Sequence, residues 1–225
     1  MAASLRDNLE TLRQTIGRSA DRAGRDPGEI TIVAVTKTFP VERIREAMSL
    51  GLKLFGENRV QEAIPKIDQI GITEATWHLI GHLQSNKAKL IEGRFAMVQS
   101  LDSVGIIEAL GRRLQSPLDV LVEINVGEEP QKTGALPADL PAVVAAINHQ
   151  PQLRLQGLMT IAPMTLEPEG ARPFFKRLRA LRDETAERLS RPLPVLSMGM
   201  TDDYPIAVEE GATMLRLGRA LFGSR

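Results

Sequence analysis

The chain has 225 residues, 43% hydrophobic and 25% charged, so it can bury a full core, and we expect one domain over residues 1–225. Its 28 Lys and Arg residues equal its 28 Asp and Glu residues, which leaves no overall positive field to attract nucleic acid or anionic lipid. The lack of cysteine excludes disulfides, thiolate nucleophiles and sulfur-ligated metals. No segment has the roughly 18 apolar residues of a membrane-spanning helix, and charges interrupt the first residues, so we expect a cytoplasmic protein.

Apolar periodicity predicts the elements in chain order. A one-sided stripe of Leu5, Leu9, Leu12 and Ile16 predicts a first helix that ends before Asp26. Short apolar runs then predict eight strands, at 30–36, 54–56, 76–80, 95–100, 120–126, 155–161, 195–198 and 214–217. Helical patterns lie between them at 41–50, 60–68, 85–91, 103–115, 140–149, 168–189 and 202–210.

Strand and helix therefore alternate along the chain. Eight strands separated by helices, without a long antiparallel hairpin signal, favour a closed parallel barrel over an open doubly wound sheet. An open sheet would need a glycine-rich fingerprint after the first strand, where this chain reads TKTFP at 36–40. The sequence predicts an α/β fold, a single (β/α)8 TIM barrel of the kind that enzymes often use, with an extra amino-terminal helix.

Lys37 stands at the carboxyl end of the first predicted strand. That strand is apolar on both faces, which is typical of a covered parallel sheet, and barrels place their chemistry at the carboxyl ends of their strands. Burial and nearby positive charge disfavour the ammonium form of a lysine, and the free amine is the form that makes a Schiff base with a carbonyl. A solvated lysine that closes a strand is the commoner case, so this hypothesis needs partners at the same rim.

The last two predicted strands end in residues suited to an anion. Ser197, Gly199 and Thr201 lie at or after the end of the seventh strand, and Gly218 follows the eighth. Hydroxyls and unpaired backbone N–H groups favour a phosphate, which barrels often bind between these two loops. Glycines that only make tight turns explain the pattern about equally well. Because a reactive amine is predicted at the same rim, on the first strand, the phosphate-site hypothesis gains weight over the hypothesis of simple turns.

Two blocks of the sequence are distinctive, WHLIGHLQSNK at 77–87 and SMGMT at 197–201. Further blocks, weaker when taken singly, lie at 33–37, 55–58 with Gln61 and Glu62, 98–102, 157–161 and 216–223. Together these blocks resemble the YggS/PLPBP family of pyridoxal phosphate homeostasis proteins, for which the first two are highly specific. The resemblance spans nearly the whole chain in order. Small departures are Thr201, where serine is common, and Arg219, where a smaller residue is usual.

This resemblance implies a monomeric barrel similar to the amino-terminal domain of alanine racemase. It implies pyridoxal 5′-phosphate (PLP) as the cofactor, held as an internal aldimine, a Schiff base, on Lys37. It also implies a role in intracellular PLP (vitamin B6) and amino-acid homeostasis without established catalysis. PLP-requiring apoenzymes are then the candidate recipients of the cofactor.

The resemblance assigns further residues to the cofactor. Ser197, Gly199, Thr201 and Gly218 match the family's phosphate cup. Arg216 matches the arginine that this family and the racemases place against the pyridine nitrogen. Because a permanent cation cannot accept a proton, it keeps that nitrogen unprotonated and makes the ring a poor electron sink. The arginine therefore argues against transaminase-type chemistry.

Four other positions have weaker assignments. Asn58 matches the family's GEN block and can offer its amide near the cofactor ring, although a turn-forming asparagine is the alternative. His78 and His82 have the spacing of a metal pair, but His78 falls within a strand, so we expect polar core or loop histidines and no metal site. Lys132, after the fifth strand, is a hypothetical second acceptor of PLP by transimination; an ordinary solvated lysine is the competing interpretation.

Two alternatives stay open for the function. An amino-acid racemase of the alanine racemase type needs two opposed bases and normally takes a tyrosine from a second domain in a dimer partner. The single tyrosine here, Tyr204, lies beside Pro205 and is poorly placed for that role. The other alternative is a barrel that binds a different phosphorylated metabolite without a covalent bond. A PLP-binding protein that is not an enzyme remains the expected function.

Overall fold

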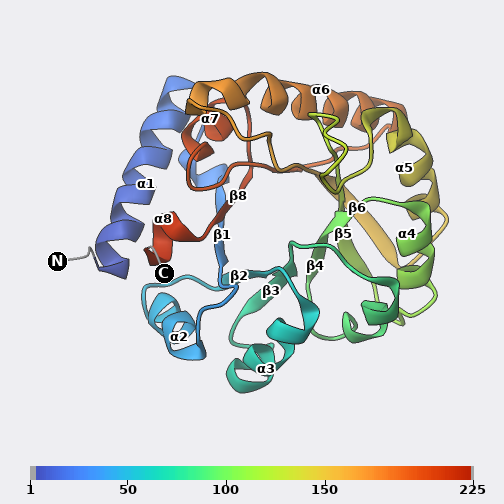
Figure 1. The fold of residues 1–225 in the computed structure, drawn as a ribbon, viewed down its shortest axis with the longest axis horizontal. Coiled ribbons are helices and arrows are strands. Elements are labelled where there is room, and N and C mark those ends of the chain that lie inside the picture. Colours follow the sequence, from blue (N-terminus) through green and yellow to red (C-terminus); the bar gives the residue numbers. More distant parts are fainter. Residues whose placement is uncertain (1–3, 224–225) are drawn as a thin grey trace.

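The computed structural model describes residues 4–223 and contains a closed barrel of eight parallel strands in the order β1 to β8 (Figure 1). The strands are β1 Thr31–Val35, β2 Leu54–Glu57, β3 Thr76–Leu79, β4 Met97–Leu101, β5 Leu118–Glu123, β6 Leu153–Met159, β7 Val195–Ser197 and β8 Met214–Leu217. The α-helices are α1 Leu5–Arg22, α2 Val41–Ser49, α3 Val60–Ile70, α4 Val104–Gly111, α5 Leu140–Asn148, α6 Arg172–Leu189, α7 Tyr204–Glu209 and α8 Arg219–Phe222. The predicted α/β barrel is confirmed.

The extra amino-terminal helix is also present. Helix α1 begins at a capping box in which the Ser4 side chain accepts from the Asp7 backbone and Asp7 bonds back to the Ser4 backbone. Its apolar stripe of Leu5, Leu9 and Leu12 is buried. The helix contacts α7 and α8, which come from the other end of the chain (Figure 1). It therefore covers the side of the barrel where the first and last strands meet.

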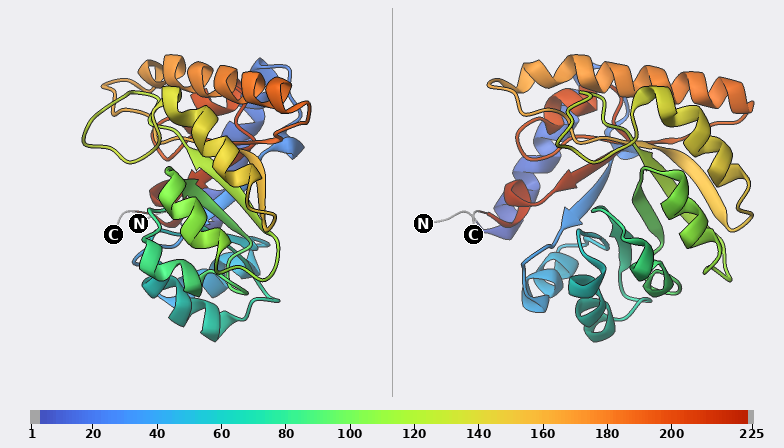
Figure 2. Two further views of the ribbon diagram at one scale, coloured as in Figure 1. Left: turned by 90° about the vertical axis from the view of Figure 1, so that its right-hand side faces the viewer. Right: turned by 45° about the vertical axis from the view of Figure 1, so that its right-hand side comes forward.

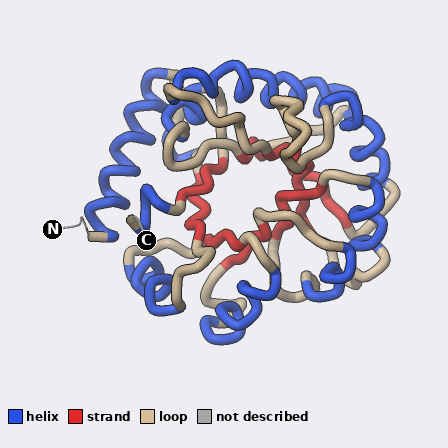
Figure 3. The backbone as a smooth tube through the Cα atoms, viewed as in Figure 1, coloured by secondary structure: helices blue, strands red, loops and turns tan. Residues whose placement is uncertain are grey.

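Two apolar layers explain why the strands are hydrophobic on both faces. Side chains of β1 alternate, so Val33 and Val35 belong to a cluster inside the barrel while Ala34 packs in the larger cluster between strands and helices. The interior cluster also contains Met159 and Met214. Figure 3 shows the ring of strands enclosed by helices, and Figure 2 shows α6 lying along one side. In a parallel barrel covered by helices, both faces of each strand are buried, so apolar side chains are needed on both faces.

Several element boundaries differ from the prediction. The ladder of β5 ends at Glu123 and that of β6 at Met159, although apolar residues continue to Val126 and Ile161. Val126 is buried against the outer core without pairing in the ladder, so apolarity overstates strand length at the rim. The predicted helix at 85–91 is a 3-10 helix, Ser85–Leu90, and the predicted 103–115 helix is shorter. Within residues 4–223, no helix combines the length and apolarity needed to cross a membrane.

Candidate functional site

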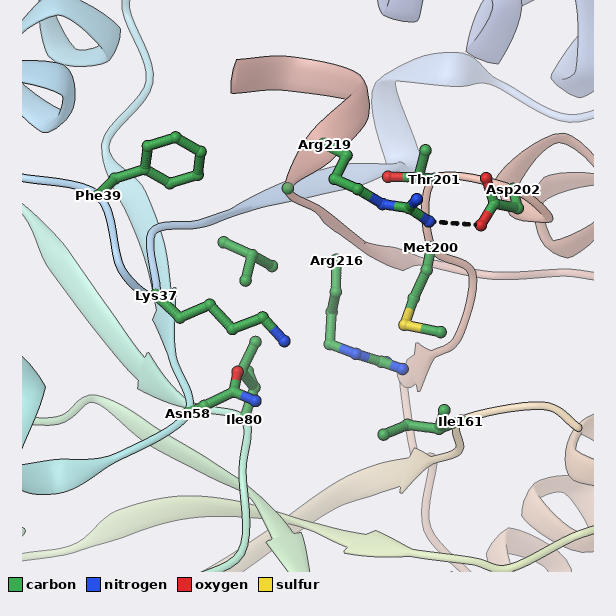
Figure 4. A pocket seen from close by; sticks show the side chains of 12 residues that line it. Lys37, Phe39, Asn58, Ile80, Ile161, Met200, Thr201, Asp202, Arg216 and Arg219 are labelled. Atoms are coloured by element: carbon green, nitrogen blue, oxygen red, sulfur yellow. Dashed lines mark hydrogen bonds and ion pairs between the residues drawn. The ribbon is translucent and has the colours of Figure 1, made fainter. Parts of the chain in front are cut away.

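A cavity of about 460 Å³ opens at the carboxyl-end rim of the barrel, a size common for small-molecule sites (Figure 4). Its lining comes from the carboxyl ends of β1, β2, β3, β6, β7 and β8 and the loops that follow them. Five residues singled out in the sequence line it together: Lys37, Asn58, Thr201, Arg216 and Gly218. Parallel strands bring these positions together because all their carboxyl ends meet at one rim.

Lys37 and Arg216 both line the cavity (Figure 4), and they come from the neighbouring strands β1 and β8, in which Val33 pairs with Arg216. Arg219 adds a third cation to the lining, and its Nη2 lies 2.7 Å from Oδ2 of Asp202. Asp202 is the one acidic residue among the described residues that line the cavity. The lining therefore has an excess of positive charge, which favours an anionic ligand.

Arg216 is a fixed part of the cavity lining. The residue is 4% exposed, its Nη1 donates to Ser197 Oγ at 2.7 Å, and its Nη2 donates to the Thr160 carbonyl at 2.6 Å. Burial lowers the pKa of Arg216 to about 10, and the negative charges of Glu123 and Asp203 oppose that shift. The guanidinium therefore remains a cation at neutral pH, with two of its nitrogens held in place.

A chain of buried hydrogen bonds supports this arginine from below. Ser197 Oγ donates its proton to Gln99 Oε1 at 2.7 Å, so its lone pairs are left for Arg216. The other end of that amide, Gln99 Nε2, lies 2.9 Å from His78 Nδ1 and donates to it. Burial lowers the pKa of His78 to about 4, which keeps the ring neutral and Nδ1 an acceptor. His78 and Gln99 thus orient Ser197 toward Arg216.

The sequence reasoning missed Gln99 and Thr160 as parts of the site. Gln99 lies in strand β4 between the apolar residues Val98 and Leu101, and a long polar side chain within such a run was the available signal. His78 is a buried polar residue of β3, and the ring of His82 is exposed, with Nδ1 3.6 Å from Asp102 Oδ2. Within residues 4–223, no group of three His, Cys, Asp or Glu side chains could hold a metal ion.

Two predicted phosphate-cup residues, Ser197 and Gly199, lie outside the cavity lining. The Ser197 side chain is fully buried, and its Oγ donates to Gln99 and accepts from Arg216. Gly199 has a φ of 95°, and a Cβ there would lie 2.6 Å from the Cβ of Ala207, so close packing requires glycine. Direct contact of these two residues with a cofactor stays a prediction.

Lys132 also lies outside the cavity lining. Its Nζ donates to the Ala162 carbonyl at 3.2 Å and lies 2.5 Å from Glu129 Oε2. The bond to Ala162 ties the loop after β5, yellow-green in Figure 2, to the loop after β6. The hypothesis that Lys132 receives PLP stays a prediction.

Burial of His78 is expected to make the stability of the barrel depend on pH. Because the folded-state pKa is about 4 and the ordinary value is 6.5, the unfolded chain binds a proton first as the pH falls. Stability is then complete above about pH 6.5 and declines by about 3 kcal/mol between pH 6.5 and 4. Replacing His78 with asparagine, whose Oδ1 can accept from Gln99, should remove this part of the profile in urea unfolding.

His149→Asn is the matched control, because His149 is exposed and is not a member of the hydrogen-bonded group of His78, Gln99, Ser197 and Arg216. This variant should keep the pH profile of the unchanged protein. A His78→Asn protein with the same loss of stability on acidification would contradict the assignment. The comparison separates His78 from the carboxylates, which titrate in every variant.

The whole chain matches known proteins. The family model of the alanine racemase N-terminal domain matches residues 2–225. A pyridoxal phosphate homeostasis protein of Aquifex aeolicus is 40% identical over 222 residues, which cover 97% of each chain. One of Escherichia coli K12 is 40% identical over 226 residues, covering 97% of this chain and 95% of the relative.

Solved structures agree with these matches. PipY of Synechococcus elongatus PCC7942, solved with PLP bound, has a TM-score of 0.84 and 36% identity and covers 98% of this chain and 100% of its own. Alanine racemase of Clostridium difficile 630 shares the fold, with a TM-score of 0.76, 16% identity, and coverage of 98% of this chain and 56% of that chain. The resemblance seen in the sequence is confirmed. The chain belongs to the alanine racemase N-terminal domain family, among its pyridoxal phosphate homeostasis proteins.

Proposed function

We propose that this protein binds PLP in the rim cavity through a Schiff base on Lys37. In this proposal it serves PLP and amino-acid homeostasis as a cytoplasmic monomer without catalytic turnover, and PLP-requiring apoenzymes receive the cofactor. The observation that carries the proposal is that Lys37 and a fixed Arg216 together line a cavity with excess positive charge. The PLP-bound structure of the 36% identical PipY supports it.

The chemistry of the lining fits each part of PLP. Lys37 supplies an amine for the aldehyde, and the release of water leaves a carbon–nitrogen double bond. Thr201, Gly218 and Arg219 offer a hydroxyl, exposed backbone and a cation for the phosphate. Apolar side chains suited to the faces of an aromatic ring complete the wall, and they are Val35, Ile80, Ile161 and Met200.

Arg216 favours storage over catalysis. PLP supplies an aldehyde and an electron-withdrawing ring, and that ring withdraws electrons well only when its nitrogen is protonated. A guanidinium donates hydrogen bonds and accepts no proton, so Arg216 would keep the nitrogen unprotonated. The buried bonds to Ser197 and Thr160 prevent the side chain from turning away. A weak electron sink suits a protein that holds the cofactor without transforming amino acids.

The racemase alternative receives no support from the position of Tyr204. This residue is 8% exposed and packs in the core between the strands and the helices. It is absent from the cavity lining, so it cannot serve there as the second base without rearrangement. The described residues thus place Lys37 in the cavity without an opposing tyrosine.

Borohydride reduction of the PLP-loaded protein, followed by peptide mapping, tests the proposed attachment. Reduction converts the double bond to a stable single bond, and the label should appear on the peptide that contains Lys37. A label on a different lysine, or none, would contradict it. An alanine racemase assay on the same preparation tests the role, because turnover at enzyme-like rates would favour the racemase alternative.

A further inference from the structure

We infer that a clamp of three side chains, the buried Glu57 and Lys66 and the partly exposed Glu62, positions Lys37 by holding the residues on both sides of it. This inference rests on the proposed attachment of PLP to Lys37 and adds three positioning residues to that site. The clamp residues come from the end of β2 and from helix α3, so they fix the loop after β1 from a neighbouring βα unit.

Lys66 is the centre of the clamp. The residue is 8% exposed, and its Nζ donates to the Thr36 carbonyl at 2.8 Å, to Glu57 Oε1 at 2.7 Å and to Glu62 Oε1 at 3.2 Å. An ammonium has three N–H donors, and each has an acceptor here. The first of these acceptors belongs to the residue that immediately precedes Lys37.

Thr36 is held at two further points. Its Oγ1 donates to Glu57 Oε1 at 2.6 Å, and its backbone N–H donates to the Gly56 carbonyl at 3.0 Å. Both Thr36 and Glu57 are fully buried. The residue before Lys37 therefore has its backbone carbonyl, its backbone amide and its side chain all hydrogen-bonded.

Thr38 is held from the other side of Lys37. Its backbone N–H donates to Glu62 Oε1, the same oxygen that accepts from Lys66. Thr38 has a φ of 66°, a left-handed conformation that a β-branched residue adopts only when its surroundings impose it. Both neighbours of Lys37 thus depend on the ammonium group of Lys66. Thr36 bonds to it directly, and Thr38 is connected to it through Glu62.

The clamp is poorly explained as a device for stability alone. Burial raises the pKa of Glu57, which shows that its charge is costly there, although Lys66 and Thr36 favour the charged form. Glu57 Oε2 is buried and accepts no hydrogen bond within the described part of the chain. A buried ion pair with an unsatisfied oxygen often stabilises a fold no better than apolar residues would. What this pair provides is a fixed backbone at position 37.

A fixed backbone should favour attachment of an aldehyde at Lys37. The conformational entropy of the loop is lost when the protein folds, so it is not lost again when a ligand binds. If the loop is mobile before the ligand binds, the entropy cost of ordering it weakens binding. We expect the loss of one charge-assisted bond in the clamp to weaken attachment by about tenfold.

Glu62 is the best position for a test because its side chain is 29% exposed and its removal leaves the core intact. Glu62→Ala removes the acceptor for Thr38, whereas Glu62→Gln keeps an oxygen there. Glu42→Ala is the matched control, since Glu42 is an exposed glutamate in the first turn of α2. The readouts are amide hydrogen exchange at Thr38 in the cofactor-free protein and the Kd for pyridoxal, which carries the aldehyde but no phosphate.

For Glu62→Ala we expect faster exchange at Thr38 and a Kd for pyridoxal that is about tenfold higher. The Glu62→Gln and Glu42→Ala proteins should resemble the unchanged protein in both readouts. Unchanged exchange, or faster exchange with an unchanged Kd, would overturn the clamp and leave the proposed function standing. Lys37→Ala binding pyridoxal as tightly as the unchanged protein would instead overturn the proposed attachment, and the clamp with it.

Discussion

Replacing Lys37 with alanine is expected to abolish covalent attachment of PLP while the barrel stays folded. Within residues 4–223, Lys37 is the one lysine that lines the cavity, so no second amine is in position to replace it. The side chain is only partly buried and lies in a loop, which keeps the effect on the core small. The loss should be complete: a yellow sample for the unchanged protein, a colourless one after dialysis for the variant, and no borohydride label.

Lys132→Ala is the matched control, because it removes another partly buried rim-loop lysine that lies outside the cavity lining. This control should stay yellow and keep the label on Lys37. Transfer of PLP to an apoenzyme is then compared between the Lys132→Ala protein and the unchanged protein, which separates delivery from attachment. Equal transfer from the Lys132→Ala and unchanged proteins would end the hypothesis that Lys132 is a second acceptor. A yellow Lys37→Ala protein with a stable adduct would contradict the main assignment.

The fold could be predicted because a closed parallel barrel leaves a strong signal. The strands carry mostly apolar residues on both faces, as Val33 and Ala34 of β1 illustrate, and the helices between strands carry one-sided stripes. Strand ends were less predictable. Rim residues such as Val126 bury their side chains after the ladder has ended, so hydrophobicity alone cannot locate the last hydrogen-bonded pair.

The site was predicted in part, and the limit lies in side-chain direction. Position at a strand end was sufficient to bring Lys37, Thr201 and Gly218 to one cavity. Ser197 also stands at a strand end, but its hydroxyl points to buried partners beneath Arg216. A one-residue difference along a strand decides which face a side chain occupies, and no local pattern records that choice.

The clamp could not be predicted for a different reason. Lys66 falls on a helix, where a charged residue is usually on the solvated face. Its acceptor at Thr36 is thirty residues away in sequence, and only the packing of α3 beside the β1 loop brings the two together. Long-range contacts of this kind depend on tertiary geometry. The sequence indicated this part of the chain through the block at 55–58 with Gln61 and Glu62, without indicating its geometry.

Gly157→Ala is expected to destabilise the barrel by more than about 4 kcal/mol, the range of severe backbone clashes. A Cβ at this position would lie 1.8 Å from the carbonyl oxygen of Val195 and 2.7 Å from its carbon. Both are backbone atoms of β7, the strand that pairs with β6, so neither can move without shifting the strand. Strand β7 ends at Ser197, and its displacement would also disturb the support of Arg216. Urea unfolding measures the loss.

Gly17→Ala supplies the control, because a Cβ at Gly17 in helix α1 would meet nothing within 4 Å. Alanine is the better helix former, so this variant should gain roughly 0.5–1 kcal/mol. Opposite signs for the same chemical change would show that the cost at Gly157 comes from the approach of β7 and not from glycine as such. The free energy of unfolding of Gly157→Ala could instead lie within about 1 kcal/mol of that of the unchanged protein, a difference that ordinary substitutions produce. In that case strand β7 must lie further from β6. The geometry that orients Ser197 toward Arg216 would then be wrong as well.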